Sequence, residues 1–127
     1  MNQIDHVLLI DDDVPTNFIH EVILKKTNKF KQIHSVLSAS EALNYLQIKR
    51  PNLIFLDINM PALSGWDFID QFRSLPLEQK EEIVIVMVST SMDPKDRQRA
   101  EVCNEIQEFV SKPISVEKIE DILVSHF

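Results

Sequence analysis

Side chains that could bind a metal ion or a phosphoryl group stand directly after four short apolar runs of the chain. Runs of this kind are typical of strands that are buried on both faces of a parallel sheet. Ligands of an open α/β sheet bind at the carboxyl ends of its strands, so we expect these side chains to share one crevice. In chain order they are Asp11, Asp12 and Asp13, then Asp57, then Ser89, Thr90 and Ser91, and finally Lys112.

Several carboxylates in one crevice require a counter-charge. Two like charges about 4 Å apart repel by roughly 4 kcal/mol at an effective dielectric constant of 20. Asp11, Asp12 and Asp57 therefore favour proton uptake, a lysine or a divalent cation, and oxygen ligands of this charge suit Mg²⁺ or Mn²⁺ rather than zinc. A cation and Lys112 would stabilise the equatorial oxygens of a phosphoryl group, with a carboxylate or hydroxyl as the nucleophile. The pattern predicts a phosphoryl-binding pocket.

Each of these residues also has a simpler structural explanation when it is taken singly. Asp13 stands two residues before a proline and is expected to cap a helix. Ser89 and its neighbours could cap the next helix, and Lys112 could be a surface lysine. Complementary groups after four strands together favour a site. The histidines share no spacing that suggests a metal triad or a phosphohistidine, and they are His6, His20, His34 and His126.

Helical patterns alternate with the apolar runs, which predicts the fold. The expected strands cover residues 7–10, 33–37, 53–56, 83–88 and 109–110. The expected helices begin near Pro15, at the capping boxes Ser38/Glu41 and Ser64/Asp67, at Asp93-Pro94 and at Ser115. Phe18, Ile19, Val22 and Ile23 repeat at helical spacing in the first of these, and the fourth runs to about Cys103. We expect an α/β fold with three α/β/α layers, a doubly wound five-stranded parallel sheet in the flavodoxin-like order 2-1-3-4-5.

Composition excludes several other classes of protein. The 127 residues fit one domain, and Gly65 is the only glycine, which excludes glycine-rich phosphate loops. The net charge of −7 argues against a nucleic-acid partner. The single cysteine, Cys103, excludes an internal disulfide and a cysteine-based zinc site. Neither a membrane span nor a signal peptide is evident in the sequence. We expect a cytoplasmic protein with no membrane partner.

With these motifs the chain resembles the receiver domain of two-component response regulators, and in particular the single-domain receivers of the chemotaxis type. The resemblance covers essentially all of residues 1–127, and no output domain is expected. The matching motifs are Asp11-Asp12, the stretch Leu56-Asp57-Ile58-Asn59-Met60-Pro61 with Gly65, Ser89, and Lys112-Pro113.

The resemblance implies a role for each site residue. It implies that Asp57 accepts the phosphoryl group and that Ser89 and Lys112 bind its oxygens, with Thr90 as the second candidate for the hydroxyl. Phe109 matches the switch aromatic of the family, and the Lys112-Pro113 bond is expected to be cis. The implied ligands of Mg²⁺, or of Mn²⁺, are Asp12, Asp57 and the main-chain carbonyl of Asn59, with Asp11 acting chiefly through water.

The resemblance also implies a function. The chain would take a phosphoryl group from a histidine kinase or a histidine phosphotransfer protein onto Asp57. It would then signal to an unknown downstream protein through its fourth helix, fifth strand and last helix. It would be no enzyme beyond its own phosphorylation and dephosphorylation. A degenerate receiver that only binds proteins is the alternative. A dehalogenase-type phosphohydrolase is disfavoured, since such enzymes need an acid where Asn59 stands.

Overall fold

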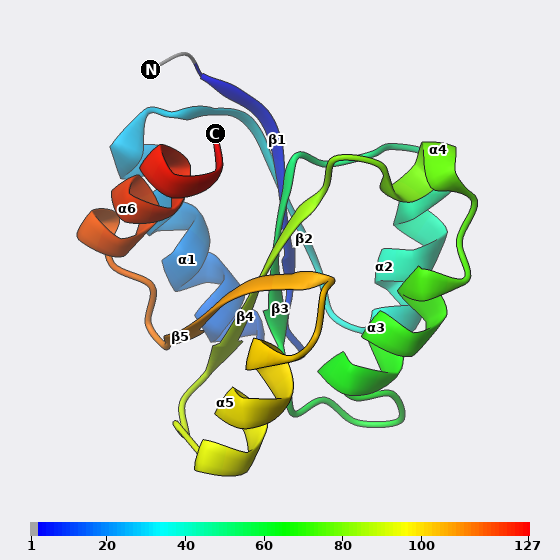
Figure 1. Cartoon of the computed structure of the whole chain (residues 1–127). Coiled ribbons are helices and arrows are strands. Elements are labelled where there is room, and N and C mark those ends of the chain that lie inside the picture. Colours follow the sequence, from blue (N-terminus) through cyan, green and yellow to red (C-terminus); the bar gives the residue numbers. More distant parts are fainter. Residues whose placement is uncertain (1–2) are drawn as a thin grey trace.

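Five parallel strands form one sheet in the order β2-β1-β3-β4-β5, as the alternation of strands and helices predicted. The structure is a computed structural model, and it describes residues 3–127. Helices lie on both faces of the sheet and complete three layers (Figure 1). The strands are β1 (Ile4–Ile10), β2 (Phe30–Val36), β3 (Leu53–Asp57), β4 (Val84–Ser89) and β5 (Ile106–Ser111).

Two helices cover one face of the sheet, and three longer helices with one short one lie on the other side (Figure 1). The first pair is α1 (Val14–Thr27) and α6 (Val116–His126). The others are α2 (Ala39–Leu46), α3 (Gly65–Arg73), α4 (Leu77–Lys80) and α5 (Pro94–Glu101). The four-residue helix α4 was not predicted, because it buries no side chain and so has no apolar pattern. The helices expected as the fourth and the last are therefore α5 and α6, and α5 ends at Glu101 rather than near Cys103.

The central strands carry continuous apolar runs because both of their faces are covered. Every residue of β3 is buried, and so are the last five of β1. Leu8 and Ile54 point into the core beneath α2 and α3, whereas Leu9 and Phe55 point into the core beneath α1 and α6. Burial on two faces makes these strands a rigid base for whatever follows their carboxyl ends. Among the helices of residues 3–127, none has both the length and the apolar character that a membrane crossing requires.

The predicted helix caps are confirmed, with one difference. Asp13 accepts a hydrogen bond from Thr16 N at the start of α1, and Ser115 accepts one from Lys118 N at the start of α6. A complete capping box joins Ser64 and Asp67 before α3. The box at α2 is incomplete: Ser38 accepts from Glu41 N, but the Glu41 carboxylate accepts from Leu37 N instead of Ser38 N.

Of the apolar residues whose spacing indicated α1, only Ile23 packs against the core, and it is only partly buried. Phe18 is 66% exposed and Ile19 is 48% exposed. The buried residues of α1 are Asn17, His20 and Leu24, which follow one another at intervals of one helical turn. Two polar side chains therefore occupy the face that packs on the sheet, and the contacts that stabilise them there belong to the site described below.

A second buried histidine lies between the sheet and α2. The His6 ring, on β1, has its Nε2 atom 2.7 Å from the hydroxyl of Tyr45 on α2. The ring of His34 on β2 stacks on the other side of Tyr45, with ring centroids 4.3 Å apart. Burial lowers the pKa of His6 below its usual value, and the positive charge of Lys49 and the nearby His34 act in the same direction.

We expect His6 to make the fold less stable in mild acid. Below a pH of about 6.5 the unfolded chain protonates His6 while the folded chain does not, so the unfolded state binds more protons and the free energy of unfolding falls. Urea denaturation of the wild type and His6→Leu between about pH 7 and pH 5 measures this, and the variant should have the smaller slope with pH. Tyr45→Phe, which keeps His6, should retain the wild-type slope. Equal slopes in the wild type and His6→Leu would contradict the assignment.

Candidate functional site

Three carboxylates meet where β1 and β3 end. Ile10 pairs with Leu56 in the sheet, so Asp11 and Asp57 follow these two residues at the same level. Each of Asp11, Asp12 and Asp57 offers a carboxylate oxygen, and these oxygens all lie within 4.8 Å of one another. Asp11 and Asp57 are buried, whereas Asp12 is exposed. The predicted acidic crevice is present at the edge of the sheet where strand order reverses.

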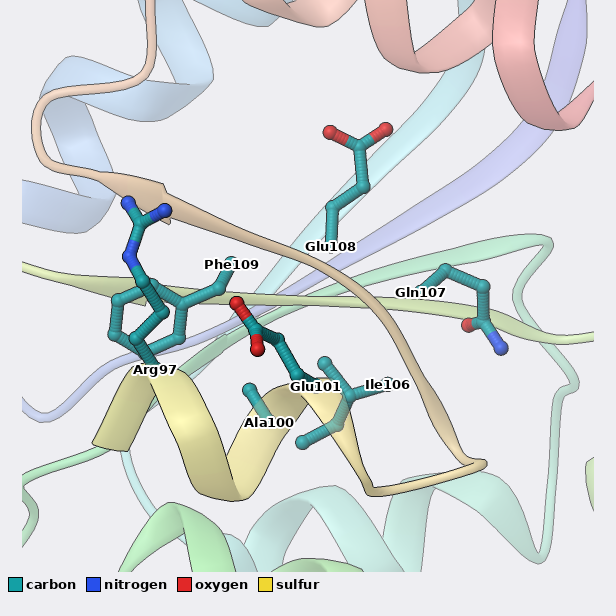
Figure 2. Close-up of a pocket in the computed structure, with 7 residues that line it drawn as sticks. All are labelled: Arg97, Ala100, Glu101, Ile106, Gln107, Glu108 and Phe109. Atoms are coloured by element: carbon teal, nitrogen blue, oxygen red, sulfur yellow. The ribbon is translucent and has the colours of Figure 1, made fainter. Parts of the chain in front are cut away.

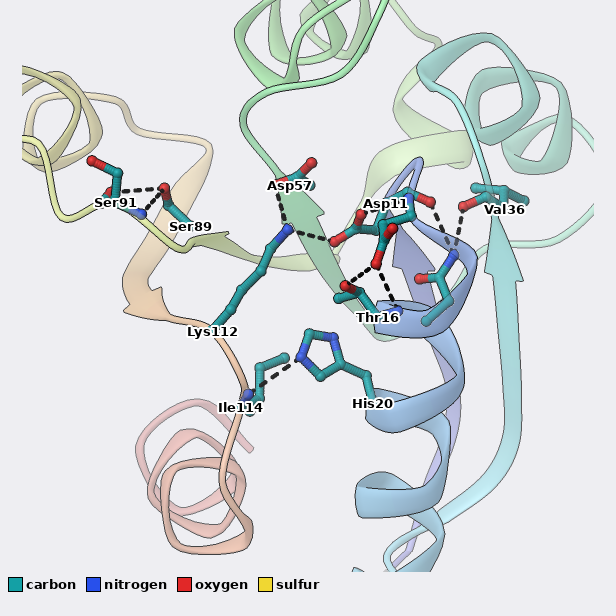
Figure 3. Close-up of polar contacts among 11 residues, drawn as sticks. Asp11, Thr16, His20, Val36, Asp57, Ser89, Ser91, Lys112 and Ile114 are labelled. Atoms are coloured by element: carbon teal, nitrogen blue, oxygen red, sulfur yellow. Dashed lines mark hydrogen bonds and ion pairs between the residues drawn. The ribbon is translucent and has the colours of Figure 1, made fainter.

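Lys112 enters this crevice from the end of β5. Its Nζ atom lies 2.6 Å from Asp11 Oδ2 and 2.7 Å from Asp57 Oδ1, so one ammonium bridges two acids (Figure 3). The Lys112 side chain is only 11% exposed. The main chain of Lys112 is also held, because its N–H donates to Ser89 O at 2.9 Å. The Lys112-Pro113 peptide bond that follows is cis, as the resemblance implied.

The charges of the crevice do not balance. Burial raises the pKa of Asp57, and the negative charges of Asp11 and Asp12 raise it further, although the hydrogen bond from Lys112 acts against them. Burial acts to lower the pKa of Lys112, but hydrogen bonds to Asp11 and Asp57 outweigh it, so the pKa of Lys112 is raised and the amine stays charged. One ammonium faces three carboxylates, which leaves excess negative charge that a divalent cation would neutralise.

The loops that carry Asp11 and Asp57 are held by close main-chain contacts. Gly65 N donates to Ile58 O at 2.7 Å, and a Cβ atom at Gly65 would lie 2.5 Å from Asp57 O. A side chain at this position would push the Asp57 main chain aside, which explains the only glycine of the sequence. On the other side, Asn17 Nδ2 donates to Asp11 O at 2.9 Å and, at 3.4 Å, to Val36 O at the end of β2.

The two candidate hydroxyls differ in their surroundings. Ser89 is buried at the end of β4, and its Oγ atom donates to Ser91 O at 2.7 Å and accepts from Ser91 N at 3.1 Å. This hydroxyl is therefore engaged with its own loop and not with Asp57 (Figure 3). Thr90 is exposed and lies beside Lys112 at the rim of another pocket. Asn59, two residues beyond Asp57, is exposed as well.

Phe109 lies on β5, the strand that pairs with β4. It is half-buried and is paired with Met87 of β4 in the sheet register. The guanidinium carbon of Arg97, on α5, lies 5.9 Å from the centre of the Phe109 ring. Figure 2 shows both side chains at the edge of a pocket of about 310 Å³ between α5 and β5.

Trp66 makes a second connection from the site to α5. It follows Gly65 directly, and its ring Nε1 donates to Asp96 Oδ1 at 3.2 Å. The guanidinium carbon of Arg99 lies 4.3 Å from the centre of the same ring. Fluorescence of Trp66 would therefore report on the contact between α3 and α5, and not only on the loop after Asp57.

Two residues that support the site were not predicted from the sequence. Asn17 binds the main chain of Asp11, and the buried His20 Nε2 accepts a hydrogen bond from Ile114 N at 3.3 Å. The available signal was the spacing of Asn17, His20 and Leu24 along one face of α1. The apolar residues beside them produced a competing helical pattern that concealed it. Of the other predicted residues, Ser89 and Thr90 stand at the end of β4, where Thr90 lines a pocket with Lys112, whereas Phe109 lies on the neighbouring α5–β5 surface.

Comparison with known proteins agrees with this geometry. Residues 7–124 match the family described as the response regulator receiver domain. A two-component response regulator from Cytophaga hutchinsonii has a similar structure, with a TM-score of 0.92 and 34% identity, and the likeness covers 98% of this chain and 97% of that one. A response regulator receiver protein from Dyadobacter fermentans has a TM-score of 0.88 and 25% identity over 97% of this chain and 98% of that one.

Curated relatives are more distant and longer. The transcriptional regulatory protein CitT of Bacillus subtilis is 27% identical over 95% of this chain and 51% of its own length. The probable C4-dicarboxylate response regulator DctR of Halalkalibacterium halodurans is 27% identical over 94% of this chain and 50% of its own length. The chain thus spans about half the length of these relatives.

Relief of charge repulsion in the crevice is testable without any ligand. We expect Asp12→Asn to raise the free energy of unfolding in a chelating buffer by up to about 1 kcal/mol, because one of three mutually repelling carboxylates is removed. The gain is small because solvent screens the charge of the exposed Asp12. Urea denaturation at low and high salt measures it, and the gain should shrink at high salt. Asp121→Asn, the same change at an exposed site on α6, is the control. A loss of stability in Asp12→Asn alone would contradict the repulsion.

Proposed function

Because the chain belongs to the response regulator receiver domain family, we propose that it is the phospho-accepting component of a two-component phosphorelay. In this proposal Asp57 takes a phosphoryl group from a histidine kinase or a histidine phosphotransfer protein. The observation that carries it is the buried Asp57 carboxylate, held by Lys112 at 2.7 Å beside Asp11 and Asp12. Asp11 is also buried and paired with Lys112, but both of its carboxylate oxygens accept hydrogen bonds, Oδ2 from Lys112 Nζ and Oδ1 from Asp13 N.

The proposed transfer is an in-line displacement at phosphorus. An oxygen of the Asp57 carboxylate attacks the phosphorus atom, and a P–O bond forms while the P–N bond to the donor imidazole breaks. The electron pair of that bond stays on the imidazole nitrogen, and Asp57 becomes an acyl phosphate. Lys112 moves from the Asp57 carboxylate to a phosphoryl oxygen and keeps its charge, consistent with its raised pKa. Its hydrogen bond to Asp11 Oδ2 keeps it in the crevice during this step.

The residues of the crevice fit a divalent cation. Asp11, Asp12 and Asp57 supply only oxygen ligands, and their charge exceeds that of Lys112. These carboxylates, together with the main-chain carbonyl of Asn59, would hold Mg²⁺ or Mn²⁺, with Asp11 acting chiefly through water. The bound cation would neutralise negative charge on the transferring phosphoryl oxygens. The chain then acts only on itself and is no enzyme for another substrate.

The proposed output is a rearrangement of the surface formed by α5, β5 and α6. A phosphoryl group adds roughly −1.5 to −2 charge and three acceptor oxygens. The Ser89 hydroxyl would leave its partner Ser91 and donate to one of these oxygens. Movement of Ser89 would vacate volume beside β5, and Phe109 is the neighbouring side chain that can fill it. A downstream protein would recognise the changed surface.

Substitution of the phosphoacceptor tests the first part of this proposal. We expect the wild type to gain one phosphoryl group in intact-mass measurements with acetyl phosphate and Mg²⁺, and Asp57→Asn to gain none. Asp121→Asn, which makes the same change on α6, should label like the wild type. Undiminished labelling of Asp57→Asn would reject the assignment. A wild type that takes no phosphoryl group from acetyl phosphate or from phosphorylated partners would favour a degenerate, protein-binding receiver.

Hydrogen exchange tests the second part. With beryllium fluoride, a mimic of the phosphoryl group, and Mg²⁺, we expect amide protection to change at residues 89–91 and along α5 and β5, because the Ser89 hydroxyl and Phe109 move. Asp57→Asn under the same conditions should show no change. Protection changes that stay within residues 57–65 and never reach residues 89–112 would show that this switch does not operate.

A further inference from the structure

We propose that His20 is a positioning residue for Lys112, acting through the main-chain amide of Ile114. The effect of His20 on phosphorylation rests on the proposed function, in which Lys112 binds the phosphoryl group. The contact itself does not rest on it. His20 belongs to α1 and is 3% exposed, and its Nε2 atom accepts a hydrogen bond from Ile114 N at 3.3 Å (Figure 3).

The hydrogen bond completes the attachment of the loop that carries Lys112. On one side, Lys112 N donates to Ser89 O at 2.9 Å and ties the loop to β4. Pro113 has no N–H group, so the amide of Ile114 is the next main-chain donor along the chain. This amide is in a buried residue, and a buried donor requires an acceptor. His20 supplies one from α1, and the loop is held on both sides of Pro113.

The attachment matters because the position of Lys112 Nζ is narrowly defined. The atom contacts Asp11 Oδ2 at 2.6 Å and Asp57 Oδ1 at 2.7 Å, and a shift of its main chain would lengthen one or both contacts. Asn17 binds Asp11 O one turn earlier on the same helix. The two polar residues on the buried face of α1 therefore hold the two loops whose side chains form the ion pair between Asp11 and Lys112.

The role of His20 requires one particular form of its ring. A ring nitrogen that accepts a hydrogen bond carries no proton, so the proton of the neutral ring must be on Nδ1. Burial lowers the pKa of His20, the positive charge of Lys112 lowers it further, and Asp11 acts in the opposite direction. The net direction keeps the ring neutral at pH 7. Leucine at this position would leave the Ile114 amide without its acceptor, whereas glutamine carries an oxygen that can accept.

Phosphorylation kinetics of matched variants test the consequence for Lys112. We expect His20→Leu to accept phosphoryl groups from acetyl phosphate about tenfold or more slowly than the wild type, because a misplaced group near the reacting atoms costs large factors in rate. His20→Gln should recover most of the rate. His34→Leu, a histidine-to-leucine change on β2, is the control and should label like the wild type. Wild-type labelling by His20→Leu, or equal loss in His20→Leu and His20→Gln, would overturn the positioning role.

Nuclear magnetic resonance tests the contact without any phosphoryl donor. In the wild type at pH 7, long-range proton–nitrogen spectra should show His20 Nδ1 protonated and Nε2 bare. The Ile114 amide should exchange slowly in the wild type and His20→Gln, and faster in His20→Leu. A protonated Nε2 in the wild type would overturn the inference even if His20→Leu fails to fold. If the wild type shows the expected ring form but never accepts a phosphoryl group, the contact stands and the proposed function fails.

Discussion

The bridge that Lys112 makes between Asp11 and Asp57 is the interaction on which the rest of the structure depends. Two buried carboxylates and an exposed third would repel one another if no cation lay between them. A buried ion pair is weak evidence of stability, because desolvation of the charges offsets their attraction unless the geometry is good. Here the fold provides that geometry, with contacts of 2.6 and 2.7 Å. The charge that remains unbalanced is negative, and a divalent cation would neutralise it.

The geometry is maintained by contacts among main-chain groups. The parallel register of β1 and β3 sets Asp11 and Asp57 at the same level, and the bond from Lys112 N to Ser89 O sets the lysine against β4. Because Gly65 has no side chain, its main chain can lie closer to the Asp57 main chain than any other residue would permit. Such contacts act through a densely packed and rigid sheet, so small displacements at the crevice are transmitted and not absorbed.

Two contacts connect this part of the molecule to α5. Trp66 lies directly after Gly65 and binds Asp96, and Arg97 lies over the ring of Phe109 beside β4. The first contact begins beside the loop after Asp57, and the second begins on β5. Both reach the same helix, which buries only Ala100 among its own residues. A helix with so little buried surface is a suitable element for a rearrangement, because few apolar contacts oppose its movement.

The sequence by itself determined the sheet, its order and the residues that meet at its edge. Continuous apolar runs identify strands that are buried on both faces, and the polar residues that end them must meet at one edge when the strands are parallel. The starts of the helices could also be predicted from the sequence, because a cap is a contact between residues three positions apart. Most of the candidate site was therefore predictable, since its residue types and their positions after strands are local features of the chain.

Only the tertiary structure decided which face of α1 is buried and which residues support Lys112. Phe18 and Ile19 are apolar, as core residues usually are, but both are exposed. The acceptor of the Ile114 amide is a histidine, His20, which is 94 positions away in the sequence. Asn17 Nδ2 and His20 Nε2 bind main-chain groups of other segments, and such pairings have no periodicity to detect. Apolar burial leaves a regular pattern in a sequence, whereas hydrogen bonds between distant segments do not.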